Sequence, residues 1–327
     1  MGKPRIAIFY GDKRNNGDYD NGVWMDILGI PFINKIEDAG NFDVIIRTLW
    51  IESTVQGWSQ EIRRRFPNVI QIGLSDHPLS THISKMPAAQ QVAYLRDLAH
   101  LDGLMALTEE ERQWYSIAVP NIPVIKVGLP FPFESYTKKY AKLQKDSRFI
   151  GLGVGASDND RNFISSAAIM NVLHLSEKTD IPGLFLSLPQ QLLGSTSTYA
   201  DFYGDIYLHE RQNMYSFYER LNQCKFVINL ADRNTPGRLQ GEAAFFGIPV
   251  IGSDRLELQR ELFPSLAVSP YSLEDAYNKA LYLLTASDEE IKKITDYAAK
   301  KLAAYNYRKS RSKFYRFISS IIAAKSL

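Results

Sequence analysis

One segment of the sequence combines residue types that could hold a charged, hydroxyl-rich ligand. It is NTPGRLQGEAAFFGIPVIGSD, residues 234–254. Pro236 suits the first position of a helix, because its missing N–H is not needed there. The N–H groups of Gly237 and Arg238 could then bind a diphosphate or sugar hydroxyls. Glu242, about one helical turn further on, could accept two hydrogen bonds from a ribose diol. The alternative is a capped helix whose glutamate is exposed.

A second segment with similar properties is GLGVGASDNDRNF, residues 151–163. Gly153 and Gly155 allow a close approach of the backbone to a ligand, and Arg161 stands at the start of the next predicted helix. A helix N-terminus together with an arginine is a favourable seat for an anion. The alternative is a tight strand-to-helix turn that binds nothing.

The first half of the chain offers acid, base and cationic side chains after its predicted strands. Asp76 and His77 lie in GLSDHPLSTH, where either could act as a general base on a hydroxyl group. Asp12, Lys13 and Arg14 follow the first predicted strand and could contact a polar ligand. The alternatives are a turn histidine before a proline and a polar loop.

The elements that must position these segments follow a regular alternation. Apolar runs of strand length alternate with helical stretches, which indicates parallel sheets covered by helices on both faces. Residues 130–147, rich in proline, aromatic residues and lysine, interrupt the alternation and are the predicted connection between two domains. The predicted fold class is α/β, with two Rossmann-like doubly wound domains facing a central cleft and a helical C-terminal tail. In such sheets ligands bind outside the carboxyl ends of the strands.

The predicted strands span residues 5–11, 42–50, 68–76, 102–108, 124–130, 148–155, 183–188, 205–210, 225–231, 248–254 and 266–270. N-terminal helix caps are predicted at Thr108 with Glu111, Ser272 with Asp275 and Ser287 with Glu290. Apolar residues near the C-terminus recur at helical spacing and predict packing in preference to membrane insertion. They are Phe314, Phe317, Ile318, Ile321 and Ile322.

The composition is that of an ordinary globular protein, with 45% hydrophobic and 23% charged residues. A formal net charge of +2 argues against a strong global attraction for nucleic acid. The basic run YRKSRSKFYR predicts a solvated helix face, with contact to an anionic lipid surface or nucleic acid as the alternative. The one cysteine, Cys224, predicts a small buried side chain, and the sequence has no zinc-ligand spacing. Without a signal peptide or a spanning apolar run, the predicted location is cytoplasmic, with membrane association as the alternative.

The second half of the chain resembles the donor-binding domain of GT-B glycosyltransferases, especially the large retaining family 4. That family carries a Glu, then Phe-Gly, then a second Glu eight positions after the first, followed by Gly-x-Pro-Val-Ile. Here Gly237 matches the motif glycine, Glu242 matches the second Glu, and residues 247–251, GIPVI, match the strand entry. Asn234 takes the place of the first Glu, and Thr235 lies between it and the motif glycine.

Other segments match the family in the same order, so that the resemblance covers roughly residues 100–285. Arg161 and the following asparagine stand where the family has a Lys-Asn or Arg-Asn that reaches the donor phosphates. His209 lies in the segment whose first part cradles the nucleotide base in the family. The family usually has an arginine after the first strand of the donor domain, which GVGASD lacks, and Arg233 or Arg238 could compensate.

The resemblance implies a metal-independent, hexosyltransferase-like enzyme that transfers a sugar from a nucleotide sugar to a hydroxyl group. The donor would be a UDP- or GDP-sugar, with no further cofactor, and the acceptor a sugar, glycan or glycolipid. The family favours retention of configuration, whereas Asn234 carries no charge to stabilise an oxocarbenium-like transition state. The implied domains are an acceptor-binding domain over 1–135, a donor-binding domain over 136–290, and C-terminal helices over 291–327 that pack back on the first domain.

In the first domain, the implied acceptor contacts are Asp12, Lys13 and Arg14. Asp76 or His77 would be the general base on the acceptor hydroxyl if the enzyme inverts, and His77 would contact the donor sugar if it retains.

Three alternatives remain open at this point. A phage-type DNA glucosyltransferase shares the GT-B fold and a similar chain length, although the near-neutral charge argues against duplex binding. A protein that only binds a sugar nucleotide would fit the asparagine at position 234. A sugar-nucleotide epimerase on the same fold would convert its donor with no acceptor present.

Overall fold

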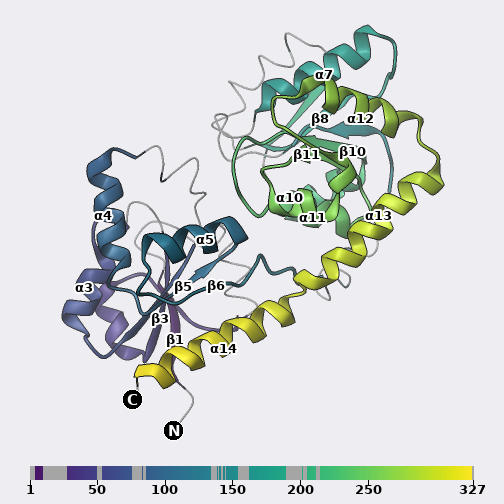
Figure 1. The fold of residues 1–327 in the computed structure, drawn as a ribbon. Coiled ribbons are helices and arrows are strands. Elements are labelled where there is room, and N and C mark those ends of the chain that lie inside the picture. The colour runs from purple at the N-terminus through teal and green to yellow at the C-terminus, as the bar shows by residue number, and fades with distance from the viewer. Residues whose placement is uncertain are drawn as a thin grey trace. The chain divides into compact units, whose positions relative to one another are not determined.

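The computed structural model divides the chain into two compact units, which are described separately (Figure 1). Unit 1 comprises Met1–Pro132 and Tyr305–Leu327, and unit 2 comprises Phe133–Ala304. The structure describes residues 4–9, 28–49, 54–75, 83, 86–133, 138, 140, 143, 145–153, 162–188, 201, 205–210 and 214–325. Residues 291–304, which the sequence assigned to the C-terminal tail, belong to unit 2.

Unit 1 contains a parallel sheet with strand order β2-β1-β3-β4-β5-β6. Its strands are β1 (Ile6–Phe9), β2 (Phe32–Ile33), β3 (Val44–Thr48), β4 (Ile70–Leu74), β5 (Gly103–Ala106) and β6 (Val124–Lys126). Its helices include η1 (Ile36–Asn41), α3 (Trp58–Arg65), α4 (Ala88–Leu98), α5 (Glu109–Ala118) and α14 (Tyr307–Lys325). The predicted strands are confirmed, and β2, only two residues long, was too short to leave a pattern in the sequence.

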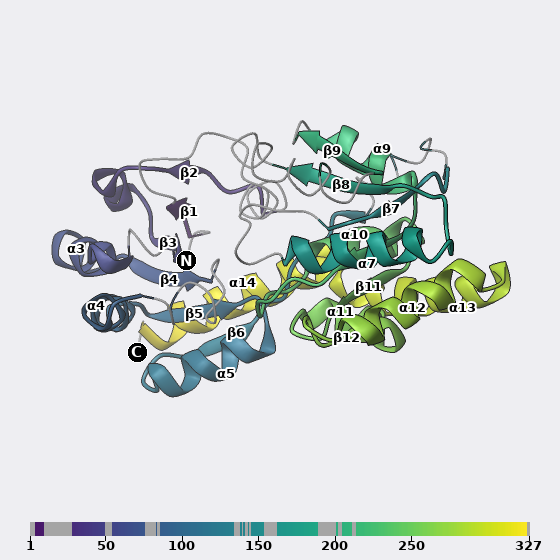
Figure 2. The same ribbon diagram turned by 90° about the horizontal axis from the view of Figure 1, so that it is seen from above.

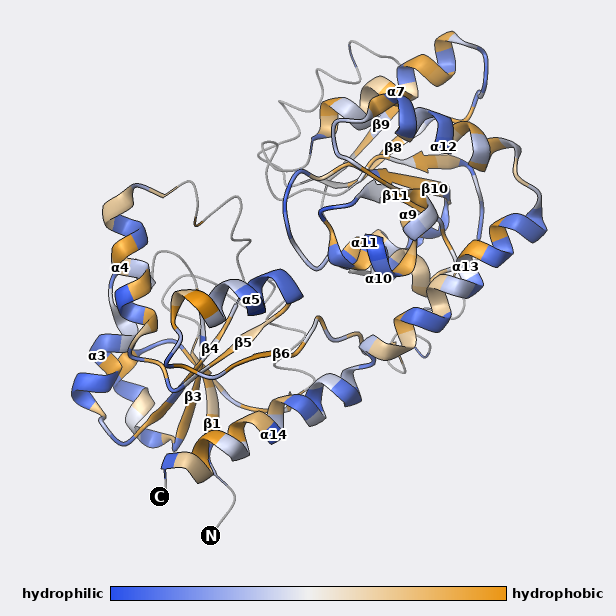
Figure 3. Cartoon of the chain, in the orientation of Figure 1, coloured by the Kyte–Doolittle hydropathy of each residue, from blue (hydrophilic) through white to orange (hydrophobic). Residues whose placement is uncertain are grey.

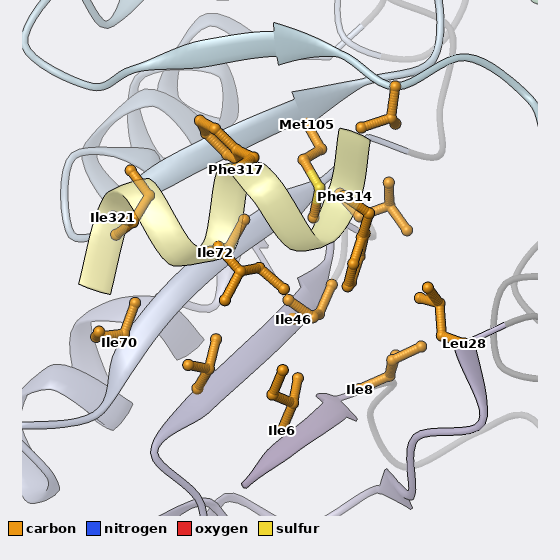
Figure 4. Close-up of a cluster of buried hydrophobic side chains, with 14 of the residues drawn as sticks. Ile6, Ile8, Leu28, Ile46, Ile70, Ile72, Met105, Phe314, Phe317 and Ile321 are labelled. Carbon is orange, nitrogen blue, oxygen red and sulfur yellow. The ribbon is translucent and has the colours of Figure 1, made fainter. Parts of the chain in front are cut away.

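The sheet of unit 1 is covered on both faces, so its strands are apolar on both sides. Successive residues of β1 alternate between two cores: Ile6 and Ile8 lie in one, Ala7 and Phe9 in the other. The first core is closed by α14 (Figure 4). The second contains residues of η1 and α3.

The apolar face of α14 confirms the packing predicted from the C-terminal sequence. Its buried members are Phe314, Phe317, Ile318 and Ile321, with Ile322 partly buried beside them. A side chain at Gly103 would begin 2.9 Å from the ring of Phe317, so the absence of a side chain in β5 makes room for this helix. Within the described residues, no helix has the length and apolar character to span a membrane.

Two of the three predicted helix caps are confirmed. Thr108 caps α5 and Ser287 caps α13 (Asp288–Leu302), and each forms a capping box with the glutamate three residues later. Ser272 precedes α12 (Leu273–Thr285), but its side chain makes no cap hydrogen bond, so that prediction is wrong. Its ψ of 76° lies outside the extended conformation that Thr108 and Ser287 adopt, and that conformation directs a cap side chain toward the helix N–H groups.

Unit 2 contains a second parallel sheet, with strand order β12-β11-β10-β7-β8-β9. Figure 2 shows β7, β8 and β9 following one another across one half of it. The strands are β7 (Phe149–Gly151), β8 (Gly183–Leu188), β9 (Ile206–Glu210), β10 (Cys224–Asn229), β11 (Val250–Ser253) and β12 (Ala267–Val268). The helices include α7 (Phe163–Leu175), α9 (Met214–Asn222), α10 (Arg238–Phe245), α11 (Glu257–Leu262), α12 and α13.

The strands of both units are the most consistently apolar segments of the chain (Figure 3). In unit 2, Cys224 is buried at the start of β10, as predicted. Burial raises the pKa of its thiol, so the side chain is a packed, uncharged group. Helix α13 contacts α10 and α11, which places it in unit 2, whereas α14 belongs to unit 1.

Candidate functional site

The topology of the unit 2 sheet marks one position for a ligand. The chain proceeds from β7 to one edge of the sheet and from β10 to the other, so the switch point lies between these two strands. Gly153, after β7, has a φ of +80°. A side chain there would begin 3.4 Å from Oδ1 of Asn229, the last residue of β10. The backbone after β7 therefore passes close to the carboxyl end of β10.

The segment that leads from β10 into α10 is held by the start of α11. The N–H of Glu257 donates to the carbonyl of Thr235 at 3.1 Å, and the N–H of Leu258 donates to the carbonyl of Pro236 at 2.9 Å. Pro236 therefore does not occupy the first helical position, as the sequence had predicted. The helix begins at Arg238, because Gly237 turns the chain through a left-handed conformation first.

Gly237 is required at this turn for two reasons. Its φ is +81°, a conformation that side-chain-bearing residues rarely adopt. A side chain there would also begin 2.8 Å from Oε1 of Gln240 and 3.2 Å from Cβ of Leu256. The hydrogen bonds of the described residues include none from the N–H of Gly237 or of Leu239. The first turn of α10 therefore has donors and a positive dipole end that suit an anionic ligand.

Glu242 lies in the second turn of α10 and is buried, with 4% of its side chain exposed. Its Oε1 accepts hydrogen bonds from the Tyr218 hydroxyl and from Nε of Arg238, both at 2.9 Å. The alternative of an exposed glutamate on a capped helix is therefore wrong. A ribose hydroxyl that binds this carboxylate would have to share it with the Tyr218 hydroxyl and the Arg238 guanidinium.

Tyr218 is a site residue that sequence reasoning missed. It is buried on α9, and its ring packs against Tyr140 at a centroid distance of 4.6 Å and against Phe246 at 5.2 Å. Phe133 stacks on Phe245 of α10 at 5.7 Å. Aromatic residues of the predicted interdomain connection thus pack on the helix that carries Glu242. The sequence shows these aromatic residues but not which helix they contact.

A second polar cluster joins the loops after β10, β11 and β12. Arg255 Nη1 forms an ion pair with Oδ1 of Asp232, and the Tyr271 hydroxyl donates to Oδ2 of the same carboxylate. That hydrogen bond favours the protonated phenol and raises the pKa of Tyr271. Each of the three residues directly follows a predicted strand, and from that position the sequence could have predicted that they lie close together. The cluster fixes the three loops relative to one another at the carboxyl edge of the sheet.

Asn162 connects the start of α7 to the same edge. It occupies the N-cap position of α7 with a φ of 51° but makes no side-chain cap hydrogen bond, and its Nδ2 donates to the carbonyl of Pro270 at 2.7 Å. Its Oδ1 accepts from the Ser165 hydroxyl at 2.7 Å. The amide is therefore engaged in holding the loop after β12.

Of the remaining predicted site residues, two lie within the residues that the structure describes, Asn234 and the backbone of His209. Asn234 is half-buried in the segment before Gly237. His209 lies in β9 at the edge of the sheet, and its side chain is outside the described part. The other predicted residues lie outside the described residues: Asp12, Lys13, Arg14, Asp76, His77, Gly155 and Arg161. In the part of the chain that is described, no group of three or more His, Cys, Asp or Glu could hold a metal ion.

Comparison with known proteins gives matches in structure only. Neither a family model nor a curated protein matches the sequence. A structure described as trehalose-6-phosphate from E. coli bound with UDP-2-fluoro glucose superimposes with a TM-score of 0.73 at 11% identity, over 97% of this chain and 98% of that chain. The chain has the GT-B fold.

Two further structures agree with this GT-B assignment. The apo structure of OtsA has a TM-score of 0.69 at 14% identity and covers 85% of this chain and 72% of that chain. A TarM variant from S. aureus, in complex with Fondaparinux, alpha-GlcNAc-glycerol and UDP, has a TM-score of 0.68 at 10% identity, over 84% and 54%. At 10–14% sequence identity, these structural matches establish the fold alone.

In this GT-B chain, the predicted site residues that the structure brings together are those around the start of α10. Thr235 and Gly237 shape the turn, and Arg238 and Glu242 form an ion pair one helical turn apart. The strand-end position beside the switch point, the left-handed glycine and the buried carboxylate together form the candidate ligand site.

Proposed function

We propose that this chain is a glycosyltransferase that transfers a sugar from a nucleotide sugar to a hydroxyl acceptor. The observation that carries the proposal is the turn at the start of α10: Gly237 in a left-handed conformation, with the buried Glu242 further along the same helix. It lies at the carboxyl edge of the second sheet of a GT-B fold. A diphosphate and a ribose are the chemical groups that such a turn suits.

The donor would bind to unit 2, with its diphosphate at the N-terminus of α10. The leaving group in this reaction is a nucleoside diphosphate, so hydrogen-bond donors and cations that stabilise it meet the main catalytic demand. The N–H groups of Gly237 and Leu239 would supply such donors, and we propose that the transfer proceeds without a metal ion. We propose a UDP- or GDP-sugar, and the names of two structural neighbours mention UDP ligands.

We propose retention of configuration, with the acceptor bound near Asp76 and His77 of unit 1.

Asn234 is the reason to keep a second candidate, a protein that binds the sugar nucleotide without transferring the sugar. An amide at this position can hydrogen-bond a sugar hydroxyl but supplies no negative charge to a cationic transition state. Slow hydrolysis of the bound donor in the absence of acceptor would favour the transferase over the binding protein.

The first test is calorimetric titration of the full chain with UDP, GDP, ADP, CMP and dTDP and their common sugars. One nucleoside diphosphate should bind in the titration. In a separate thermal unfolding measurement it should also raise the unfolding temperature, because a ligand at a hundredfold excess over its Kd stabilises the folded state by about 2.7 kcal/mol. If none binds at millimolar concentration, the proposal fails.

A matched pair of variants locates the site. Glu242→Gln keeps the shape of the side chain and an acceptor for Tyr218, but it removes the charge. We expect the Kd of the nucleoside diphosphate to rise about tenfold or more, because hydrogen bonds to charged groups contribute about 1.5–3 kcal/mol. Glu111→Gln is the control, since Glu111 is equally buried, at 3% exposure, but lies in unit 1. Equal affinity in the two variants would place the site elsewhere.

A further inference from the structure

The N-terminal part of α14 carries a dense set of exposed cations, here called the cationic face: Arg308, Lys309, Arg311, Lys313 and Arg316. The helix contains no acidic residue. The hydrophilic part of α14 is visible next to its more apolar C-terminal part (Figure 3). The run YRKSRSKFYR, which the proposed function leaves without a role, forms this face.

The positive charges lie at the end of α14 where the helix dipole disfavours them. The N-terminus of a helix bears a partial positive charge, which favours acidic residues in the first turn. Helices α5 and α13 follow this rule, with three acidic residues each in the first turn, whereas α14 has none. A helix that concentrates cations at its positive end gives up local stability, and such local conflicts in natural proteins are expected where the residues have a function.

The cationic face lies on the part of α14 that the sheet leaves exposed. Helical spacing of 100° per residue puts Lys309, Lys313 and Arg316 within an arc of about 60°, which begins about 100° round the helix from Phe314 and about 40° from Phe317. The latter two are buried in the core of unit 1. Lys325, at the other end of the helix, is paired with Asp102 at 2.5 Å and does not belong to the face.

The direction of α14 places this face near one edge of the unit 1 sheet. The N–H of Tyr307 donates to the carbonyl of Phe131, which lies beyond the end of β6. Asp102, the partner of Lys325, immediately precedes β5. The helix therefore starts at the carboxyl edge of the parallel sheet and ends at its amino edge. The cationic face belongs to the half nearer the carboxyl ends of the strands.

We propose that the cationic face of α14 binds the anionic surface of a lipid bilayer. Lys309, Lys313 and Arg316 span about 11 Å along the helix, and a planar charged surface can contact all three at once. The apolar side of α14 is already used against the sheet, so the attraction is electrostatic and does not require insertion of the helix. Docking in this way brings the part of the α14-covered face of unit 1 that is nearer the carboxyl ends of the strands to the membrane. The inference does not depend on the proposed glycosyltransferase activity.

The same geometry disfavours nucleic acid as the partner. A helix that reads DNA enters the major groove, which is about 12 Å wide and surrounds much of the helix. α14 cannot lie along a groove as a free helix, because Phe314, Phe317 and Ile318 attach its C-terminal half to the sheet. The net charge of +2 for the whole chain also lacks the broad basic footprint of a duplex-binding protein.

The test is co-sedimentation of the full chain with phosphatidylcholine vesicles that contain phosphatidylglycerol. The protein should bind these vesicles at low salt, fail to bind pure phosphatidylcholine vesicles, and dissociate at high salt, because salt screens surface charge. Absence of binding to the anionic vesicles, or equal binding to the neutral ones, would overturn the proposal. So would a gel shift of duplex DNA at the same salt without vesicle binding.

Charge-removing variants assign the binding to α14. The triple variant Lys309→Gln, Lys313→Gln and Arg316→Gln should lower the partition coefficient about a hundredfold at low salt, since each cation near an anionic surface contributes about fivefold. The control triple variant Lys292→Gln, Lys293→Gln and Lys300→Gln removes the same charge from exposed positions of α13 and should bind much like the original chain. Equal loss in both variants would mean that net charge, and not this face, drives binding. All six side chains are exposed, so unfolding temperatures should stay close to that of the original chain.

Discussion

At the scale of single residues, the candidate site depends on a glycine that no other residue can replace without strain and on a buried carboxylate. Gly237 combines a left-handed backbone with contacts that leave no room for a side chain. Glu242 is buried next to a cation and a phenol, so its charge is stabilised by Arg238 and Tyr218 before any ligand arrives. A carboxylate held in this way is positioned in advance, which reduces the cost of ordering it on binding.

Replacement of Gly237 by alanine should destabilise unit 2 by about 1–3 kcal/mol, because the left-handed conformation is strained for a residue with a side chain. The added methyl group would also press on Gln240 and Leu256. Denaturant unfolding followed by hydrogen exchange in α10 measures the loss. Gly247→Ala is the matched control: its φ of +67° is similar, but a side chain there meets nothing within 4 Å. Equal losses in both variants would show that backbone strain alone decides the effect.

At the scale of elements, a buried ion pair connects a strand and two helices in unit 1. Arg47 of β3 and Asp97 of α4 are fully buried, and Nη1 lies 3.0 Å from Oδ2. Ser59 of α3 donates to the same carboxylate oxygen at 2.9 Å, and the N–H of Gln60 donates to the other at 3.1 Å. Burial lowers the pKa of Arg47 and the charge of Asp97 opposes that shift, so the pair fixes how α3 and α4 pack against the sheet.

Asp97→Asn should therefore cost about 3–5 kcal/mol, because it leaves the charge of Arg47 buried without its counter-ion. The measurement is urea unfolding of unit 1. Asp296→Asn, which breaks an exposed pair between Lys292 and Asp296 on α13, should cost less than about 1 kcal/mol. Replacement of both Arg47 and Asp97 by apolar residues of similar size should recover much of the loss, and failure to recover would point to the lost hydrogen bonds of Ser59 and Gln60.

At the scale of the whole molecule, the chain completes unit 1 only at its C-terminal end. Unit 1 is discontinuous, since its core needs α14 from residues 307–325 as well as the strands of the first 132 residues. Unit 2 is formed by the continuous segment between them. Stability of the first unit therefore depends on residues that follow the whole of unit 2 in the sequence.

Phe314→Ala should destabilise unit 1 by about 3–5 kcal/mol, because it removes a fully buried ring from the core beneath α14. In hydrogen exchange, amides of β1, β3 and β4 should exchange faster, while those of β10 and β11 should not change. Phe263→Ala, at a fully buried position of unit 2, should give the reverse pattern. Faster exchange in both units after either substitution would show that the two units unfold together.

The sequence alone determined the fold class, the positions of the main strands along the chain and the confirmed caps at Thr108 and Ser287. These features follow from local hydrophobic periodicity and short-range hydrogen bonding. The sequence also singled out the turn at Gly237. Only the tertiary structure decided that α10 begins after Pro236, that Glu242 is buried against Tyr218, and that α13 belongs to unit 2. Those features depend on contacts between residues far apart in the chain, such as the hydrogen bond from Leu258 to Pro236, which leave no periodic trace in the sequence.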